Sequence, residues 1–561
     1  MSAAERRART RWGLAVGALL LAALLLVALG LRLWGLRTGL PYVYNADENA
    51  HFVPRAIGMF GHGFNPGYFI NPPAFTYLLH VAFAVGWGGE GVQRAYAADP
   101  GDVFTVARAG SALLGTLAVG LLYAAGARLF GDRRIGLLAA ALLAVCFLPV
   151  YYGHFALNDV PALAPLCLAL VGVAGVLRRG RWVDHAVAGA GLGLVCATKY
   201  TGGIVLLCLL AAAYGRPLGA RLARVALAGA VALVAFLLAN PYALLDFGAF
   251  REGLDAQSTA SRDGGGKLGL VGESGVHYYL DALTWGFGWL PLAAALAGAA
   301  VLARRDRRLA WVLIPAVAVF LVFMGIQDRY FARWLLPVFP LLCLLAAAGA
   351  LALADWVAAR RRLAPAAAGF AAFLAGLALC AQGLATVVHN DAVLAREDTR
   401  QLVRDWMVAN VPAGTKVVVE PVFPDQWASD PGRPSPATGN GARWNKWPTS
   451  RFRGRVVKLE DYERTTRPEL VDSYVRGGYC WVVTGSTQYG RAFAEPREVP
   501  AAIRYYAELR RRGEVVFRAS PYDDGAEPVP FSFDDSFNAR PFAYARPGPE
   551  IVVYRLKGCS S

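Results

Sequence analysis

Long apolar runs alternate with short clusters of arginine along this chain, and that alternation restricts its fold more than any other feature. A run of about 20 apolar residues is long enough to cross the ~30 Å hydrocarbon core of a bilayer. Clusters of basic residues between such runs mark the cytoplasmic side of a membrane protein. The clusters are Arg6, Arg7, Arg9 and Arg11; Arg128, Arg133 and Arg134; Arg178, Arg179 and Arg181; Arg216, Arg221 and Arg224; Arg304, Arg305, Arg307 and Arg308; and Arg360, Arg361 and Arg362.

If every cluster lies in the cytoplasm, two spans must separate each cluster from the next. This condition predicts a mainly α-helical polytopic membrane protein with about eleven transmembrane helices, a cytoplasmic N-terminus and an extracytoplasmic C-terminus. We interpret the first run as a retained span, because its apolar core is too long for a signal peptide and no small-residue cleavage site follows it. The expected spans lie near 13–36, 106–130, 134–152, 160–177, 184–198, 201–214, 222–240, 284–303, 309–326, 334–354 and 364–386.

The net charge of +16 suggests nucleic-acid binding at first, but the arginines form no single patch. They recur between apolar runs, as a topology signal does. With 56 % hydrophobic residues, the chain is expected to have the lipid bilayer of the cytoplasmic membrane as its partner and no nucleic acid.

The region 185–214 is too long for one span and too short for two ordinary ones. One span would place the fourth arginine cluster outside, so two short helices are preferred, joined by the sequence KYTGG, Lys199 to Gly203. A helix of about 14 residues reaches only ~21 Å, so this hairpin is expected to be recessed below the outer surface.

The same topology places most of the unusual polar residues on the outer side. The loop 37–105 contains the sequence YNADENAHF and an apolar stretch, 71–87, that we expect to lie along the membrane surface. Carboxylates, cations and histidines on one membrane face are what an active site there requires. The candidate site residues are Asp47, Glu48, His51, His154, Asp159, Lys199, Tyr200, Arg329, Tyr330 and Arg333.

Several of these residues also have ordinary structural explanations. Glu48 has the spacing of a capping box with Asn45, whereas Asp47 is free of that role and would share a helix face with His51. His154 and Asp159 could cap the next span. Arginines 329 and 333 could be interfacial anchors. Lys199 is harder to explain in this way, because a recessed cation needs a partner and a lipid phosphate is the obvious one.

The region 390–561 has a different composition, polar and rich in turn residues, and is expected to form a second domain after a transmembrane domain at 1–389. DTRQLVRDWMVANVPAG predicts a helix before the strand KVVVE, and YYAELRRRG predicts a helix before EVVFRAS. GYCWVVTG and EIVVYRL predict further strands, so the domain is of the α/β class. Cys480 and Cys559 could form a disulfide in this outer domain, while the other six cysteines lie in apolar spans and are expected to pack.

In these features the chain resembles the GT-C superfamily of membrane glycosyltransferases, specifically the dolichyl-phosphate-mannose protein mannosyltransferases and the bacterial aminoarabinose transferases of lipid A. The resemblance is carried by Asp47-Glu48 after the first span, Pro72-Pro73, HFALNDVPALA, RYFARWLLPVFP and the outer C-terminal domain. It extends over nearly the whole chain.

The resemblance implies transfer of a sugar from a polyprenyl-phosphate carrier to a lipid, glycan or protein acceptor on the outer face, with inversion at the anomeric carbon. It implies that Asp47 is the base that deprotonates the acceptor hydroxyl. Lys199, Arg329 and Arg333 would neutralise the carrier phosphate. No cofactor is expected to be required; a divalent ion near Asp47, Glu48 or His51 is conceivable, but no metal ligand is predicted.

Two other functions compete with this one. A transporter or flippase of lipid-linked sugars would favour ionisable groups in mid-span and internal repeats. The mid-span positions here are almost wholly Ala, Leu, Val and Gly, and we find no repeat. A structural anchor for the outer domain would need one span only.

Overall fold

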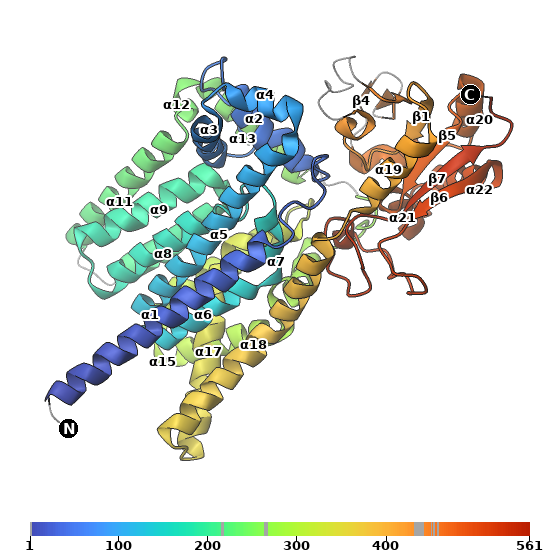
Figure 1. The fold of residues 1–561 in the computed structure, drawn as a ribbon. Helices are drawn as coiled ribbons and strands as arrows, with labels where there is room; N and C mark the ends of the chain where they lie inside the picture. The colour runs from blue at the N-terminus through green and yellow to red at the C-terminus, as the bar shows by residue number, and fades with distance from the viewer. Residues whose placement is uncertain are drawn as a thin grey trace.

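The computed structural model describes residues 3–214, 218–262, 267–430, 442–449, 451–452, 455–456 and 459–560, so Arg216 lies outside the described residues. Long helices lie side by side along a common direction, and a smaller domain containing a β-sheet follows them (Figure 1). The helices of the first part are α1 (Ala3–Leu33), α2 (Val53–Gly58), α3 (Ala74–Trp87), α4 (Gly91–Ala98), α5 (Pro100–Phe130), α6 (Arg133–Val145), α7 (Phe147–Tyr151), α8 (Leu163–Arg178), α9 (Trp182–Thr198), α10 (Val205–Ala213), α11 (Leu218–Ala239), α12 (Tyr242–Leu245), α13 (Phe247–Arg262), α14 (Gly275–Leu283), α15 (Trp289–Arg305), α16 (Arg307–Gly325), α17 (Phe339–Arg360) and α18 (Pro365–Leu394).

Ten of the eleven segments predicted to span a membrane overlap one of these helices, and the segment 134–152 overlaps two, α6 and α7. Within the described residues, seven helices are long and apolar enough to cross a bilayer, and the pair α6 and α7, bent by 60°, would make an eighth. The remaining predicted spans are the shorter helices α8, α9 and α10. The chain is therefore a multi-pass membrane protein, in which three of the predicted spans are short.

The helices α8 and α9 are short and closely packed. Helix α8 has 16 residues and α9 has 17, which at ~1.5 Å per residue give lengths below the ~30 Å of the hydrocarbon core. They pack closely: a Cβ on Gly172 of α8 would lie 2.2 Å from the backbone nitrogen of Ala188 in α9. At the outer end, the Asn158 amide donates a hydrogen bond of 2.7 Å to the Thr198 carbonyl. The segment before α8 and the last residue of α9 are thus held together.

The outer loops collect at one end of the bundle. Helices α2, α3, α4, α12 and α13 lie at the end nearer the C-terminal domain, and the N-terminus of α1 lies at the opposite end (Figure 1). Helix α3, which covers the stretch predicted to lie along the membrane surface, is seen nearly end-on there and crosses the direction of the long helices.

The C-terminal domain is an α/β domain, as predicted. Its sheet has five strands in the order β2-β1-β5-β7-β6, with β1 parallel to β2 and β5, and β7 antiparallel to β5 and β6. A separate two-stranded sheet pairs β3 with β4. The elements are α19 (Thr399–Asn410), β1 (Lys416–Val419), β2 (Asn445–Lys446), β3 (Arg451–Phe452), β4 (Arg455–Val456), α20 (Glu469–Gly477), β5 (Trp481–Gly485), α21 (Ser486–Ala494), α22 (Pro500–Arg512), β6 (Gly513–Ala519) and β7 (Ile551–Leu556).

Both faces of this sheet are buried because its strands send alternate side chains to opposite sides. Val417 and Val419 pack with Met407 of α19, whereas Val418 between them packs with Tyr505 and Leu509 of α22. The predicted helices and strands of the region are all present.

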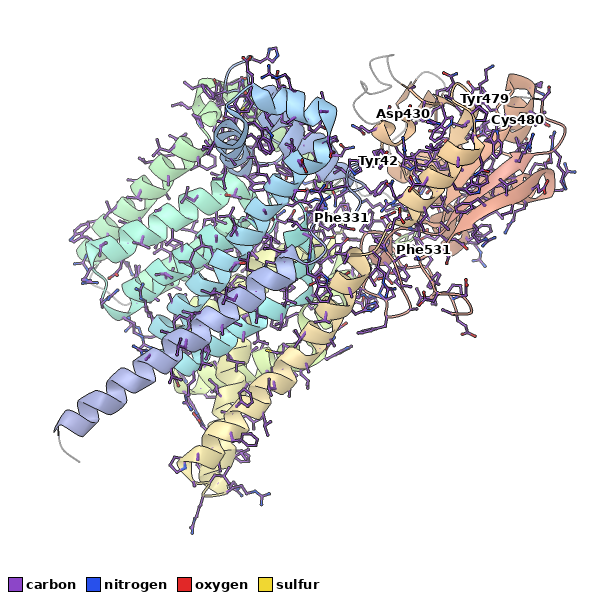
Figure 2. The ribbon with its side chains drawn as sticks, in the orientation of Figure 1. Tyr42, Phe331, Asp430, Tyr479, Cys480 and Phe531 are labelled. Carbon is purple, nitrogen blue, oxygen red and sulfur yellow. A yellow bond between two sulfur atoms is a disulfide. The ribbon has the colours of Figure 1, made fainter. Side chains whose placement is uncertain are left out.

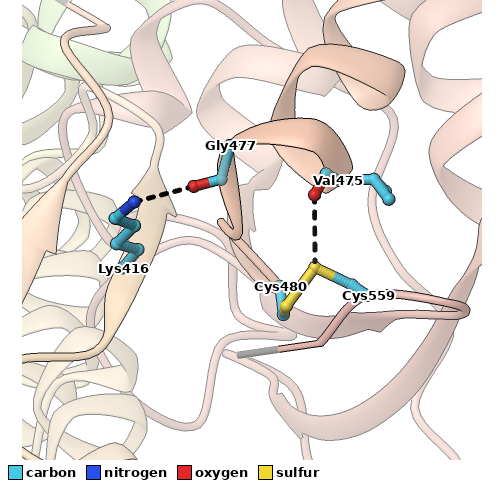
Figure 3. The surroundings of a disulfide bond; sticks show 5 residues. All are labelled: Lys416, Val475, Gly477, Cys480 and Cys559. Carbon is cyan, nitrogen blue, oxygen red and sulfur yellow. Dashed lines mark hydrogen bonds between the residues drawn. A yellow bond between two sulfur atoms is a disulfide. The ribbon is translucent and has the colours of Figure 1, made fainter.

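A disulfide joins Cys480, just before β5, to Cys559, just after β7 (Figure 3). The two Cα atoms are 5.5 Å apart, and the strands that flank them are hydrogen-bonded neighbours in the sheet. The bond that the sequence left open is therefore formed. Since structural disulfides persist in oxidising compartments, it is consistent with a domain outside the cytoplasm.

Candidate active site at the outer end of the bundle

Asp47 stands at the start of a short π-helical turn, Glu48–Phe52, in the first outer loop. The Asn45 side-chain oxygen accepts hydrogen bonds from the backbone N–H groups of Asp47 and Glu48, each 3.1 Å long, and so begins the turn. Turns of this kind occur often at functional sites, because the extra residue re-aims the side chains. The Asp47 side chain is 41 % exposed, so it can meet a ligand.

Four of the predicted residues form one cluster of alternating charge. The Lys199 Nζ lies 2.5 Å from Oδ1 of Asp159, and Nε of Arg333 lies 3.9 Å from Oδ2 of the same carboxylate. The Arg333 guanidinium also donates a hydrogen bond to Asp47. Lys199 and Asp159 are buried, Lys199 just after α9 and Asp159 in the segment before α8. Two carboxylates and two cations, which come from four separate segments, thus meet at the outer end of the short helices.

The cluster keeps Asp47 ionised. Burial opposes the charged form, but Arg333 and then His51 outweigh it and hold the pKa of the Asp47 carboxyl below its ordinary value. His51 stacks on the ring of Tyr68 with centroids 4.7 Å apart, and its Nε2 lies 3.9 Å from Oδ1 of Asp47. Burial lowers the pKa of His51, although the Asp47 carboxylate opposes this. At neutral pH the site therefore contains a carboxylate beside a neutral imidazole.

Glu48 is separated from its neighbour Asp47. Its side chain is fully buried, and both carboxylate oxygens accept hydrogen bonds of 2.8 Å from Arg108 of α5. One oxygen also accepts the N–H of Ala156 at 2.8 Å. The capping-box explanation is therefore wrong for the Glu48 side chain, because its two oxygens are held by α5 and by the loop before α8. The structure does not bring Glu48 into the open cluster.

His154 is also buried away from the cluster. Its ring nitrogens lie 3.0 Å from the Val150 carbonyl and 2.9 Å from the Trp34 carbonyl, and Nε2 is 3.5 Å from Oδ1 of Asp391. These contacts connect the end of α1, the turn after α7 and the end of α18. His154 thus fastens three helices together just ahead of Asp159.

The other candidates surround the ring of Phe331. Cation–ring distances to Phe331 are 4.9 Å for Arg333, 5.5 Å for Arg329 and 3.8 Å for Lys267. The charge of Arg329 also contributes to the low pKa of Asp47. Lys267, which the sequence analysis did not select, therefore joins the basic side of the site.

The two candidate tyrosines hold loops in place instead. The Tyr200 hydroxyl donates to the Phe69 carbonyl at 3.0 Å. Tyr330 stacks on Tyr278 with ring centroids 5.3 Å apart, and its hydroxyl donates to the Glu273 carbonyl. Neither side chain has a recorded contact with the charge cluster.

The C-terminal domain covers this end of the bundle. Phe331 lies where the bundle meets that domain, and Tyr42 and Phe531 lie along the same junction (Figure 2). Phe533 and Phe537 pack on Phe331 with ring centroids 6.2 and 6.3 Å away, and the Tyr278 hydroxyl donates to Asp534 at 2.7 Å. The loop before β7 thus lies against the aromatic residue that the site cations surround.

Sequence reasoning missed Arg108, which forms an ion pair with Glu48, and Asp391, which lies 3.5 Å from His154. A signal existed for Arg108: it is a lone charge near the start of an apolar span, and such residues rarely lack a partner. Lys267 and Phe533 to Phe537 come from loops whose positions no local pattern specifies. Among the described residues, no three His, Cys, Asp or Glu side chains are grouped so that they could hold a metal ion.

Comparison with known proteins gives the fold a class. The family model described as dolichyl-phosphate-mannose-protein mannosyltransferase matches residues 92–244, which include Asp159 and Lys199. The structure of ArnT from Cupriavidus metallidurans bound to undecaprenyl phosphate is similar over 97 % of this chain and 99 % of that chain, with 16 % identity and a TM-score of 0.51. The chain therefore has the fold of the GT-C membrane glycosyltransferases, and the resemblance drawn from its sequence is confirmed.

A second similar structure is AglB, the oligosaccharyltransferase from Archaeoglobus fulgidus, in complex with an inhibitory peptide and a dolichol-phosphate. It has 14 % identity and a TM-score of 0.49, over 90 % of this chain and 73 % of that chain. No curated protein sequence matches the chain.

Proposed function

We propose that the protein transfers a sugar from a polyprenyl-phosphate carrier to an acceptor on the outer face of the cytoplasmic membrane, by inverting displacement. The observation that carries this proposal is the cluster of Asp47, Arg333, Asp159 and Lys199, half-open at the recessed outer end of a membrane bundle. Fold alone does not decide chemistry, so the argument rests on this site.

Lys199 and Arg333 bind the phosphate of the sugar donor. Lys199 lies at the end of a short helix, below the level that a full-length span would reach, where the phosphate of a membrane-embedded carrier has to bind. A phosphate arriving there takes the place of the partly exposed Asp47 as the partner of Arg333 and joins Lys199, while the buried Asp159 keeps its contact with Lys199. Arginine binds phosphate oxygens through two parallel N–H donors, and both cations stabilise the charge that grows on the leaving phosphate.

Asp47 acts on the acceptor hydroxyl. Once Arg333 turns to the phosphate, the Asp47 carboxylate is free to accept the proton of the acceptor hydroxyl. The acceptor oxygen then forms a bond to the anomeric carbon as the bond from that carbon to the phosphate oxygen breaks. The carrier leaves as polyprenyl phosphate, a good leaving group that needs charge stabilisation more than protonation, so one carboxylate is enough.

Two observations support the outer face as the place of reaction. The last turn of α17, which carries Arg360, lies at the end of the bundle away from the C-terminal domain (Figure 1). Basic clusters of this kind mark the cytoplasmic side. The disulfide of Cys480 and Cys559 is typical of an oxidising compartment, and it lies in the domain that covers the site.

The test is direct. Purified protein is incubated with a panel of radiolabelled polyprenyl-phosphate sugars, and binding and release of the sugar are followed for the wild type and for Lys199→Met. We expect one donor to bind, and the substitution to weaken its binding about tenfold or more, since a hydrogen bond to a charged group contributes about 1.5–3 kcal/mol. If the folded Lys199→Met protein binds every donor as well as the wild type, Lys199 is an interfacial anchor. If no lipid-linked sugar binds the wild type, the proposal fails.

A further inference from the structure

A cavity of about 280 Å³ lies between the membrane bundle and the C-terminal domain, apart from the charge cluster. Thr38, Asn45 and Tyr151 line it from the bundle, and Tyr489, Val529 and Phe537 line it from the C-terminal domain. Pro528 and Pro530 on its wall are exposed, so it opens to solvent along that segment. It is a site built by both domains, and no function has yet been assigned to it.

The charges on the cavity wall are balanced pair by pair. Arg108 is paired with Glu48, and Asp398 with Arg400 at 2.7 Å. Asp535 is paired with Arg540 at 3.1 Å, and Glu550 with Arg518 at 2.6 Å. A charged ligand would have to break one of these pairs and leave a half-buried ion behind, which costs several kcal/mol. The cavity therefore favours an uncharged ligand.

The remaining wall combines aromatic rings with hydroxyl groups. Tyr44, Phe155 and Phe531 present ring surface, and Ser532, Ser536 and Thr487 contribute hydroxyls. The Tyr44 hydroxyl is buried without a hydrogen-bond partner among the described residues, while the Arg400 guanidinium stacks on its ring at 3.7 Å. A buried hydroxyl with no partner loses ~1–3 kcal/mol, which a ligand or a water must restore. An apolar chain could not do so.

We propose that this cavity binds an uncharged saccharide, the portion of the acceptor next to the hydroxyl that is glycosylated. Its volume equals that of about nine waters at ~30 Å³ each, near the lower end of ligand pockets and enough for about one or two sugar rings. Sugars join apolar C–H faces, which pack on aromatic rings, to hydroxyls that form hydrogen bonds. The inference rests on the proposed function, because it identifies the acceptor of the same site.

The chain connects this cavity to the reacting centre. Asn45 lines the cavity, and its side-chain oxygen accepts the Asp47 N–H at 3.1 Å. A saccharide in the cavity therefore lies against the residue that begins the turn bearing Asp47.

The test measures binding of a panel of uncharged disaccharides and of their uronic-acid counterparts to the full-length protein in detergent, by saturation-transfer NMR and calorimetry without any donor. Val529→Trp fills the cavity, and its matched control is Val515→Trp, an exposed position on β6. Tyr44→Phe removes one hydroxyl and keeps the ring under Arg400.

We expect at least one uncharged disaccharide to bind the wild type and the Val515→Trp control equally. Its affinity should fall at least tenfold in Val529→Trp, and about 5- to 10-fold in Tyr44→Phe for one lost hydrogen bond. The inference is overturned if no uncharged disaccharide binds, if Val529→Trp binds it unchanged, or if the uronic acids bind more tightly.

Donor binding, measured separately on the same proteins, distinguishes the two proposals. If the donor binds and no disaccharide does, the cavity is not the acceptor site and the proposed function stands. If disaccharides bind the cavity and no polyprenyl-phosphate sugar binds the protein, the saccharide site stands and the transferase function fails.

Discussion

Asp47 and Glu48 are adjacent in the chain and have opposite surroundings. Asp47 is partly exposed beside Arg333, whereas Glu48 is fully buried in a bidentate ion pair with Arg108. In the proposed reaction Asp47 accepts the proton, whereas Glu48 holds the loop after α1 against α5. The two roles can be separated by experiment, because loss of the Asp47 role should lower turnover and loss of the Glu48 role should lower stability.

Asp47→Asn should leave folding and donor affinity intact and reduce turnover about 10²- to 10⁴-fold, the usual cost of losing a general base. Glu48→Gln should leave Arg108 buried without its counter-charge and lower the free energy of unfolding by about 3–5 kcal/mol. Turnover with the identified donor and thermal unfolding in detergent measure the two effects. The roles are reversed if Asp47→Asn keeps the wild-type rate and Glu48→Gln is stable but inactive.

The low pKa of Asp47 gives the reaction a defined pH dependence. A carboxylate whose pKa lies below the ordinary ~3.9 stays ionised down to that pKa and loses its proton-accepting capacity only as the pH falls through it. The Asp47 limb of kcat/KM should therefore lie below pH ~4 in the free enzyme. Arg333→Met removes the largest influence that lowers the pKa of Asp47 against the effect of burial. The Asp47 limb should therefore move toward neutral pH, whatever the loss in rate. An unmoved limb would show that Arg333 does not control Asp47.

At the scale of the elements, the short helices α8 and α9 place Asp159 and Lys199 next to each other. Their close approach depends on glycine, since a Cβ on Gly172 would overlap the backbone of Ala188. Helix α9 meets α11 in the same way, because a Cβ on Gly193 would lie 2.1 Å from the Ala232 carbonyl oxygen. The ion pair is thus a consequence of how tightly these helices pack.

Gly172→Ala should separate α8 from α9, lower the unfolding temperature and weaken donor binding, since the Asp159–Lys199 pair spans the two helices. Gly229→Ala in α11 is the matched control, because a Cβ there meets nothing within 4 Å. The control should be neutral or up to ~1 kcal/mol more stable, as expected for Gly to Ala in a helix. Equal behaviour of the two variants in unfolding and donor binding would contradict the packing argument.

At the scale of the whole molecule, the bundle and the C-terminal domain share one site. The loop before β7 packs on Phe331, and both parts line the cavity proposed to bind a saccharide. This arrangement demands that the domain lie on the same side of the membrane as the first outer loop.

Single-cysteine labelling tests that side. Asp524→Cys, exposed in the C-terminal domain, should react with a membrane-impermeant maleimide in intact cells. Arg361→Cys, exposed between α17 and α18, is the control and should react only after the membrane is permeabilised. The opposite pattern would place the candidate site in the cytoplasm.

The sequence by itself determined which apolar segments form helices in the bundle and the α/β class of the C-terminal region. These properties depend on local hydrophobic periodicity, which acts over a few turns of chain. The sides of the spans and the recessed position of the hairpin around Lys199 stay predictions. The domain boundary at 389 and 390 and the roles of the site residues stay predictions.

The tertiary structure alone decided which charges meet. Glu48 and Arg108 are 60 residues apart, and Asp47 and Arg333 are 286 apart, so no local pattern encodes either pair. Burial separates Glu48 and His154 from the open site. In a low-dielectric interior their polar atoms must form hydrogen bonds or ion pairs within the protein. The Asp47 side chain stays partly exposed at the start of its π-helical turn, and that exposure is a property of the assembled bundle.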